Sequence, residues 1–431
     1  MDEITVTIES LGYGIFGVAR TDRGVVFVPG AAPGDVARVR VVAEKRGYRE
    51  AELLEVVTPS PARRRPPCRY VPECGGCGWQ HVGYPAQLAA KQAILRDALT
   101  RLGGVTAEAL DVRPIVPSAE WGYRHRVTLR VAGEQRLGFY RHRSHRLVEI
   151  EFCPIADDTV NAHLPAARDW LRGASTTVRR LEIASSGPGR AVLVANAEGA
   201  FRHDGEYHEK FLRGHRTIGG IVLFGKGWRR TFGKPVVRLE VEDGSTIESE
   251  GGFTQVNPAG NRRLVDAVLA LAAPQADDRV LDLYCGAGNL TLPLARRARQ
   301  AVGVESDPHS VTLARRNADR WGLANCRFIA ESAAAAAGAL AAAGERFSLV
   351  VLDPPRSGAL EALEALAAVA GGRIVYVSCD PNTLARDVGR LTALGFSLGP
   401  VQPIDLFPQT HHLESVVRLE RRGFAATGAR R

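Results

Sequence analysis

The residue with the clearest capacity for chemistry is Cys379, in the stretch YVSCDPNTLARD at residues 376–387. The apolar run 374–377 predicts a buried strand, and an amphipathic helix is expected to begin near Thr383. The thiol then lies at the carboxyl end of a strand, the edge at which open α/β sheets bind ligands. An ordinary thiol is only roughly a few per cent ionised at neutral pH. We therefore expect Cys379 to be a nucleophile, in a site that lowers its pKa or provides a base.

The loop DLYCGAGN, residues 282–289, follows a predicted strand and opens a helix. Gly286 and Gly288 permit a tight turn and a close approach of a ligand to the backbone. Thr291 replaces the last glycine of G-x-G-x-x-G, so a dinucleotide site is disfavoured. Glu305 ends the next predicted strand, where an acid binds two ribose hydroxyls. Together these features fit S-adenosylmethionine, with a plain turn between strand and helix as the alternative.

Two further segments are expected at the same edge. Asp353 ends another predicted strand and is held in an extended backbone by the two prolines that follow it. The segment 407–417 precedes the last predicted strand and contains three candidate general bases: His411, His412 and Glu414. A solvated turn is the alternative for this segment. A soft thiolate beside such a base suits attack on the electron-poor C6 of a pyrimidine, which a hydroxyl attacks poorly.

The seven cysteines of the chain include one dense group. Cys68, Cys74 and Cys77 have the spacing C-x5-C-x2-C, and Cys153 stands alone before Pro154. An odd number of cysteines without a secretion signal argues against a disulfide framework. Three clustered thiolates and a remote one fit either a zinc ion or an iron–sulfur cluster, and the spacing does not choose between them. Free buried cysteines are the third alternative.

Length and composition favour a globular protein. The 431 residues suffice for two or three domains, and 45% hydrophobic with 24% charged residues is ordinary. No apolar run is long enough to span a bilayer, and the acidic start MDEITVTIES is not a signal peptide. We expect a cytoplasmic protein with no membrane association, and a monomer as the simplest assembly.

The net charge of +9 is concentrated in two regions. One is the run at residues 63–65, and the other is the arginine-rich segment 124–146, which also contains tyrosine and histidine. Arginines interleaved with rings suit phosphate contact and base stacking, so RNA is the expected partner. A protein that is merely basic is the alternative.

The chain divides into three predicted regions. Residues 1–58 contain short alternating strands typical of a small barrel of the OB type. Residues 59–250 begin with a Pro- and Arg-rich linker, contain a helix at 84–102 and one near 157–172, and otherwise predict a mostly antiparallel sheet. Residues 251–431 alternate strands with helices, which predicts a doubly wound, mainly parallel sheet.

Taken together, these motifs resemble the bacterial RNA uracil-5-methyltransferases, and most closely the 23S ribosomal RNA branch with an N-terminal TRAM barrel and a 4Fe–4S cluster. The resemblance covers essentially the whole chain. It implies an α/β protein in which a Rossmann-like class I methyltransferase sheet follows the TRAM barrel and a central α+β domain that carries the cluster. Small departures are Asp380, where asparagine is common, and the extra His411 before His412.

The resemblance also implies the roles of individual residues. The cluster ligands are Cys68, Cys74, Cys77 and Cys153. The positions for S-adenosylmethionine are Gln255 in FTQVN, Tyr284, Asn289, Glu305, Ser332 and Asp353, with Glu331 as an alternative to Ser332. Cys379 matches the nucleophile that adds to C6 of uracil, and Glu414 the base that removes the C5 proton after methyl transfer. The same chemistry on transfer RNA, and an iron–sulfur RNA-binding protein without turnover, are the competing hypotheses.

Overall fold

The computed structural model describes residues 2–202 and 204–423, which fall into two compact units. Unit 1 is drawn from Met1–Ile94, Ser118–Pro235 and Phe407–His412. Unit 2 is drawn from Leu95–Pro117, Val236–Leu406 and Leu413–Arg431. The two units therefore alternate along the chain, and the helix α1 (Tyr84–Arg101) includes residues of both.

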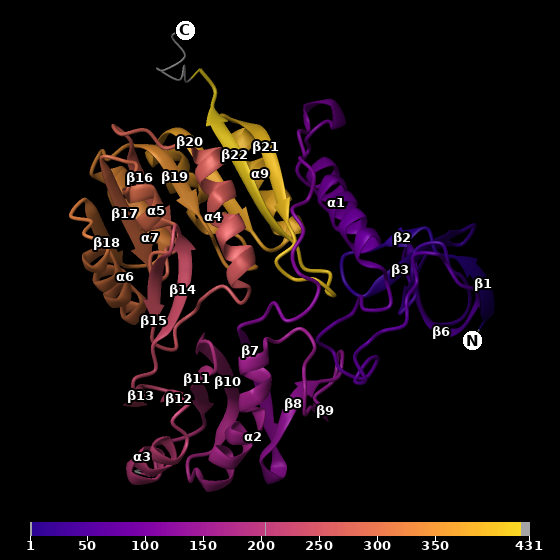
Figure 1. Ribbon diagram of the computed structural model, residues 1–431. Helices are drawn as coiled ribbons and strands as arrows, with labels where there is room; N and C mark the ends of the chain where they lie inside the picture. The colour runs from indigo at the N-terminus through magenta and orange to yellow at the C-terminus, as the bar shows by residue number, and fades with distance from the viewer. Residues whose placement is uncertain (1, 203, 424–431) are drawn as a thin grey trace. The chain divides into compact units, whose positions relative to one another are not determined.

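The first sheet of unit 1 has six strands, where the alternation of residues 1–58 predicts four or five. Its order is β1-β5-β6-β4-β3-β2, and the strands curve around a shared interior (Figure 1). Small aliphatic side chains, among them Val26, Val28 and Val39, fill this interior. The strands are β1 (Glu3–Thr7), β2 (Ser10–Leu11), β3 (Phe16–Thr21), β4 (Gly24–Pro29), β5 (Val36–Lys45) and β6 (Tyr48–Thr58).

The buried carboxylate of Asp35 connects this sheet to the segment that follows β6. Asp35 is fully buried and accepts hydrogen bonds from the backbone of Ala32 (2.7 Å) and Ser60 (2.9 Å). The guanidinium of Arg63 forms an ion pair with it at 2.6 Å. Burial alone would raise the pKa of Asp35, but these hydrogen bonds outweigh burial and lower it.

The second sheet of unit 1 has the order β13-β12-β11-β10-β7-β8-β9. Its neighbours are antiparallel except β11 and β12, which are parallel. The helices α2 (Asp158–Gly173) and α3 (Gly205–Gly214) pack on one face, where Trp170 and Phe211 join the core. The strands are β7 (Arg126–Ala132), β8 (Arg136–Tyr140), β9 (Leu147–Glu149), β10 (Val178–Gly187), β11 (Arg190–Ala197), β12 (Ile218–Gly225) and β13 (Trp228–Gly233). The sequence did not predict α3.

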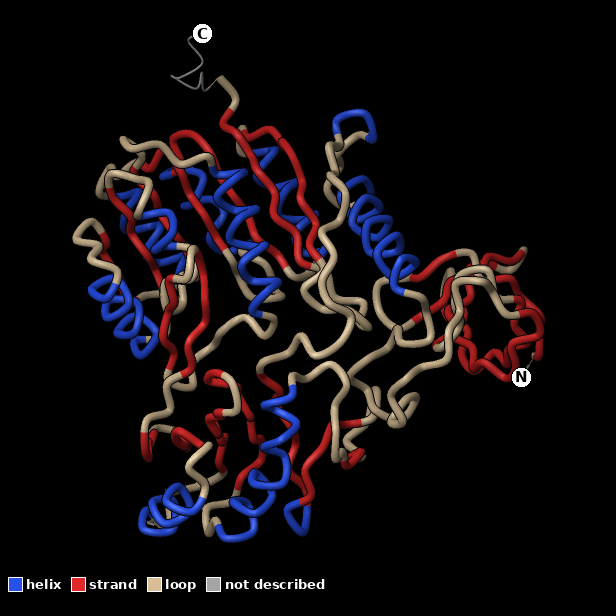
Figure 2. Tube along the Cα trace, viewed as in Figure 1, coloured by secondary structure: helices blue, strands red, loops and turns tan. Residues whose placement is uncertain are grey.

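Unit 2 contains a seven-stranded sheet of order β18-β17-β16-β19-β20-β22-β21. The strands from β18 to β20 are parallel, and β22 is antiparallel to both of its neighbours. Helices lie along the sheet (Figure 2). The strands are β16 (Arg279–Leu283), β17 (Gln300–Glu305), β18 (Cys326–Ala330), β19 (Phe347–Leu352), β20 (Ala370–Ser378), β21 (Phe396–Ile404) and β22 (Glu414–Arg421). The helices are α4 (Pro258–Ala272), α5 (Thr291–Ala295), α6 (Pro308–Arg320), α7 (Ala333–Ala342), α8 (Leu363–Val369) and α9 (Pro381–Ala393).

A hairpin of β14 (Val237–Glu242) and β15 (Ser245–Ser249) precedes this sheet, and short 3-10 turns lie at Ala107–Ala109, Gly133–Gln135 and Leu360–Ala362. Within the described part of the chain, no helix is both long and apolar enough to cross a membrane. The parallel strands β16, β17, β19 and β20 end at one edge of the sheet, which brings the predicted motifs of unit 2 to that edge.

The buried carboxylate in unit 1 yields a test of stability. Replacing Asp35 by Asn removes the charge opposite Arg63, so we expect the free energy of unfolding near pH 7 to fall by about 2–4 kcal/mol. Because the pKa of Asp35 is lowered in the folded chain, its contribution is present above the pKa of the unfolded carboxyl. It is lost as the pH falls through the folded value, so the two proteins should converge in acid.

Urea unfolding of the whole chain, followed by hydrogen exchange in peptides from β3 to β6, measures this difference. The Asp22→Asn change, at an exposed residue in the turn between β3 and β4, is the control. Equal stability of Asp35→Asn and the control near pH 7 would refute the assignment.

Candidate active site and cysteine site

Cys379 and Glu414 are brought together by the pairing of two antiparallel strands of unit 2. β20 and β22 pair with Ser378 opposite Ser415, and the same register carried one residue further sets Cys379 opposite Glu414. Facing residues of such strands have Cα atoms about 4.5–5.5 Å apart. Glu414 is buried, and Cys379 is half-buried. The predicted nucleophile and base therefore share one site at the end of β20.

Two more charged residues surround the thiol. Asp353 directly follows β19, and its charge acts on both Cys379 and Glu414. Arg356, from the same loop, acts on both groups with the opposite sign. The amide of Gln255 donates to Asp353 Oδ2 at 3.5 Å. Gln255 and Asp353, which the sequence assigned to the cofactor, thus belong to the cluster around the thiol.

The thiol does not have a lowered pKa, one of the two options that the sequence left open. Burial, with the charges of Glu414 and Asp353, raises the pKa of Cys379 to about 12. Burial also raises the pKa of Glu414 well above its usual range and that of Asp353 to about 7. The resting site therefore holds a neutral thiol beside two carboxyl groups, of which Asp353, with a pKa of about 7, is partly ionised near neutral pH and can accept a proton. The arrangement fits the second option, a base next to the nucleophile.

The other two candidate bases belong to unit 1. The rings of His411 and His412 lie 4.1 Å apart, and His411 also meets Tyr13 edge-on at 5.2 Å. The largest charge effects on the thiol come instead from Glu414 and Asp353. Of the three candidates that the sequence offered, Glu414 is the one that belongs to the same unit as Cys379.

The loop after β16 has the backbone that a close ligand approach requires. Tyr284 adopts a left-handed φ of 66°, and Gly286 and Gly288 have φ of 54° and 97°. The amide of Gly286 donates to Glu305 Oε2 at 3.1 Å, so the acid at the end of β17 fixes the turn. The other oxygen of Glu305 accepts from Asp307 N at 2.9 Å.

Three of the six predicted cofactor residues line one cavity of about 450 Å³ in unit 2. They are Tyr284, Glu305 and Ser332, joined by the loop that follows β19. Ser332 caps α7 by accepting from Ala335 N. Glu331, the alternative to Ser332, is not a lining residue of this cavity. The cavity is large enough for a small-molecule cofactor.

Asn289 is not among the residues that line this cavity. The sequence analysis did not identify the residue to which its side chain is hydrogen-bonded. Asn261 is fully buried on α4 and exchanges two hydrogen bonds with Asn289, each of 2.9 Å. A polar residue on the buried face of a helix was the available signal. Asp387 was also missed. Its carboxylate accepts from Tyr376 Oη and from Ala359 N, both at 2.7 Å, which anchors the loop after β19.

The four predicted metal ligands line a second cavity, in unit 1. Cys68, Cys74 and Cys77 come from the loop before α1, and Cys153 comes from the segment between β9 and α2. The cavity volume of about 70 Å³ is several times the roughly 10–15 Å³ that one water needs. Its remaining walls are mostly apolar, with the side chains of Gln80 and Arg124 as polar exceptions.

The cysteine loop packs against the hairpin of β8 and β9. The amide of Gly75 donates to Tyr140 O at 2.9 Å, and Cys74 forms an isolated bridge with Arg141. A Cβ at Gly75 would lie 2.8 Å from both Tyr140 O and His142 N. Only glycine fits there, so the loop and the hairpin share one fixed contact.

The donor set suits a metal centre, since cysteine thiolates bind both zinc and iron–sulfur clusters. Burial raises the pKa of Cys74 to about 11 and that of Cys77 to about 12, so a cation must displace the protons. Over residues 2–202 and 204–423, no three His, Cys, Asp or Glu side chains come close enough to hold one metal ion. The four sulfurs surround a space and do not converge on a point.

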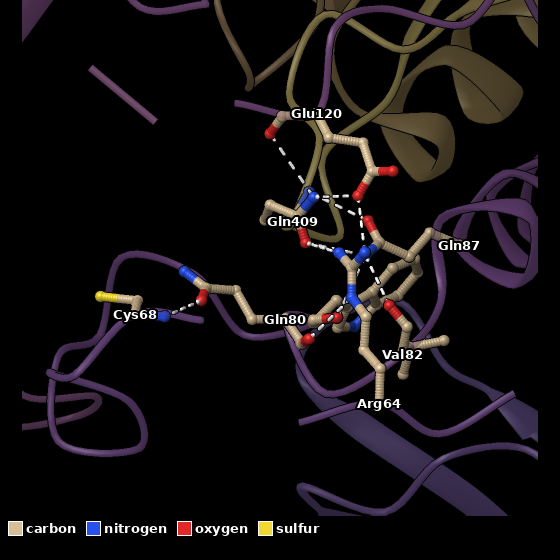
Figure 3. Close-up of polar contacts among 8 residues, drawn as sticks. Arg64, Cys68, Gln80, Val82, Gln87, Glu120 and Gln409 are labelled. Atoms are coloured by element: carbon tan, nitrogen blue, oxygen red, sulfur yellow. Dashed lines mark hydrogen bonds and ion pairs between the residues drawn. The ribbon is translucent and has the colours of Figure 1, made fainter. Parts of the chain in front are cut away.

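A buried polar network joins this region to the segment Phe407–His412 (Figure 3). Arg64 donates to Gln409 Oε1 (2.7 Å), Glu120 Oε2 (2.7 Å) and Gln80 O (3.1 Å). Gln80 in turn accepts from the amide of Cys68 at 3.3 Å. Gln409 is fully buried and has a left-handed φ of 70°, so this conformation depends on its partners.

The raised pKa of Cys379 predicts slow alkylation. At about pH 8 we expect iodoacetamide to modify Cys379 at least about a hundredfold more slowly than an ordinary thiol. The rate should keep rising with pH beyond the range in which ordinary thiols level off. Glu414→Gln and Asp353→Asn each remove a charge that opposes the thiolate, so each should raise the rate near pH 8.

Peptide mass spectrometry resolves Cys379 from the other cysteines. Asp266→Asn, an exposed carboxyl on α4, is the matched control and should leave the rate unchanged. A rate for Cys379 that levels off below about pH 9 would contradict the raised pKa.

Comparison with known proteins gives one family for the whole chain. A sequence model described as tRNA (uracil-5-)-methyltransferase matches residues 236–422, and a TRAM domain matches residues 2–54. An uncharacterized RNA methyltransferase of Gloeobacter violaceus is 38% identical, over 97% of this chain and 96% of its own. The 23S rRNA (uracil(1939)-C(5))-methyltransferase RlmD of Aeromonas salmonicida is 36% identical over the same shares.

A solved structure supports the fold. The tRNA (uracil-54, C5)-methyltransferase of Pyrococcus abyssi, in complex with S-adenosyl-L-homocysteine, has a TM-score of 0.71 to this chain at 24% identity. The match covers 96% of this chain and 100% of the other. With relatives above 30% identity over nearly its full length, the chain belongs to the RNA uracil-5-methyltransferase family.

Proposed function

We propose that this protein transfers a methyl group from S-adenosylmethionine to C5 of a uridine in 23S ribosomal RNA. The observation that carries the proposal is that Cys379 and Glu414, the chain neighbours of the paired residues Ser378 and Ser415, share one site. A buried carboxyl facing a half-buried thiol is what addition to a pyrimidine and later removal of its C5 proton require. The RlmD relatives, whose names specify a 23S rRNA uracil, support ribosomal RNA as the substrate.

S-adenosylmethionine supplies the methyl group, and we assign it to the cavity lined by Tyr284, Glu305 and Ser332. Glu305 would hold the ribose hydroxyls, because it ends β17 beside the glycine turn. The strand order of unit 2 supports a Rossmann-like, doubly wound methyltransferase sheet. Asn289, held by Asn261, is assigned to the same cofactor site.

In the first half of the reaction, the sulfur of Cys379 forms a bond to C6 of the uracil. Its proton passes to the carboxylate form of the Asp353–Glu414 pair, and the C5–C6 π electrons move toward O4, which makes C5 nucleophilic. Arg356 favours the thiolate electrostatically. Gln255, bonded to Asp353, would hold the uracil edge. C5 then forms a bond to the methyl carbon of S-adenosylmethionine as the bond from that carbon to the sulfonium sulfur breaks, which leaves S-adenosylhomocysteine.

In the second half, the carboxyl pair first releases the thiol proton to solvent, so that Glu414 is ionised. It takes the proton from C5, the C5–C6 double bond re-forms, and the bond between C6 and the sulfur breaks. The raised pKa of Glu414 makes it a stronger base than an ordinary carboxylate, which suits abstraction of a carbon-bound proton. The target uridine must leave its stack for C6 and C5 to be reached.

We further propose that Cys68, Cys74, Cys77 and Cys153 hold a 4Fe–4S cluster. In such a cluster each thiolate binds a different iron, so the sulfurs lie around a core and not around one ion. The cavity of about 70 Å³ that they line supports this arrangement. The cluster would stabilise the loop on which the hairpin of β8 and β9 rests, and would take no part in methyl transfer.

The three functional regions that we assign are 1–58, the TRAM barrel, 59–250, the region of the cysteine site, and 251–431, the catalytic region. The exposed side chains Arg143, His145 and Arg146, in the turn between β8 and β9, would contact RNA phosphates. The close backbone contact at Gly75 couples this turn to the cysteine loop.

Tritium release from RNA labelled at uracil C5 tests the reaction and the substrate together. With S-adenosylmethionine, we expect release from ribosomal RNA of a methylation-deficient strain and none from its transfer RNA. Cys379→Ala should reduce release to background, because no other group adds to C6. Cys326→Ala, a half-buried cysteine on β18, is the matched control and should remain active. Release from transfer RNA alone would make transfer RNA the substrate and leave the proposed mechanism unchanged.

Replacing Glu414 by Gln separates addition from elimination. The variant can still form the bond between Cys379 and C6 but lacks the base, so a covalent protein–RNA adduct should accumulate. We expect a slowly migrating band on denaturing gels and turnover lower by about 10²–10⁴-fold. Glu420→Gln, further along β22, should show neither effect. A Glu414→Gln protein that turns over normally, without an adduct, would refute the role.

A further inference from the structure

Arg124 lies in the wall of the cysteine cavity. The sequence placed it in an arginine-rich segment expected to contact RNA. Its Nε atom, however, is buried and has no hydrogen-bond partner. Its charge acts on Cys77 and Cys153. This Nε atom is therefore not a phosphate contact.

The side chains around Arg124 include two aromatic rings. The guanidinium carbon lies 5.9 Å from the ring centre of Tyr123 and 5.8 Å from that of Phe407. Tyr123 in turn donates to Pro408 O at 3.0 Å, which fixes that ring. Across the ranges that the structure describes, no carboxylate forms an ion pair with Arg124.

Arg124 is half-buried, and withdrawing part of a cation from water without an anion nearby is unfavourable. Arginine cannot escape this cost by losing its proton. Neutral thiols do not compensate this loss of solvation. Four thiolates around an iron–sulfur core are different, because they carry more negative charge than the core neutralises. Such a centre supplies the anion that Arg124 lacks.

We propose that Arg124 is the counter-cation of the cysteine-bound cluster, holding the cluster in the protein and raising its reduction potential. This inference rests on the proposed 4Fe–4S site. Adding one electron makes the centre more negative, so a nearby fixed cation favours the reduced form. Arg124 is thus a positioning and electrostatic residue for the cluster and has no role in methyl transfer.

The test uses the whole protein, purified without oxygen, in the wild-type, Arg124→Gln and Arg124→Lys forms. Iron and sulfide content establish the cluster, and redox titration with dithionite, followed by electron paramagnetic resonance, measures its potential. We expect Arg124→Gln to lower the equilibrium constant for reduction at least about tenfold, or about 59 mV for one electron. Iron should also pass faster to a chelator. Arg124→Lys should restore most of both properties, because it restores the charge.

Arg136→Gln, an exposed arginine of β8, is the matched control and should leave both properties unchanged. Circular dichroism and calorimetric binding of S-adenosylmethionine report whether each variant is folded. If Arg124→Gln does not fold, the comparison of Arg124→Lys with wild type decides, since a retained potential and iron-release rate then support the role of the charge.

The outcomes separate the two proposals. Wild-type protein without iron and sulfide would overturn the cluster, and with it the role of Arg124. A cluster whose potential and release rate are the same in wild type and Arg124→Gln would leave the cluster in place and overturn the inference alone. If the folded Gln and Lys variants show equal changes in reduction potential and in iron release, the shape of the side chain matters and its charge does not. That result would also overturn the role of Arg124 as counter-cation.

Discussion

The antiparallel register between β20 and β22 is the constraint on which the active site depends. A slip by one residue would turn Glu414 to the opposite face of the sheet from Cys379. β22 is held on both sides, since Glu414 also pairs with Ile404 of β21. A buried ion pair of 2.5 Å between Arg373 and Asp278 fixes the other end of β20 against the start of β16. The alignment of two reactive groups is therefore a property of the whole sheet.

Sequence patterns anticipated the parts of unit 2 whose signals are local. The apolar runs before Tyr284, Asp353 and Cys379 became strands β16, β19 and β20. β21 was missed because Gly399, Pro400 and Pro403 interrupt it, which an edge strand with an irregular register tolerates. Patterns of a few residues report burial along one segment, and they identified the strand ends well.

What the sequence could not provide is the effect of one segment on another. The raised pKa of Cys379 arises from burial and from two carboxyls, one on β22 and one just after β19. Arg124 reads as one more arginine in a basic segment, and only the folded chain aligns it with Cys77 and Cys153. Asn261 is likewise explained only by Asn289, on another element. Electrostatics and polar pairing of this kind depend on three-dimensional proximity.

The buried glutamine at position 409 bears on how the chain folds while it is being made. Arg64 and Gln409 are 345 residues apart, and Glu120 and Gln409 are 289 apart. At about 5–20 residues per second, a nascent chain reaches Gln409 roughly 17–70 s after Arg64. During that interval Arg64, Gln87 and Glu120 lack the side chain that later unites them. Synthesis of unit 1 starts before that of unit 2, but unit 1 cannot assemble fully until the segment Phe407–His412 has been made.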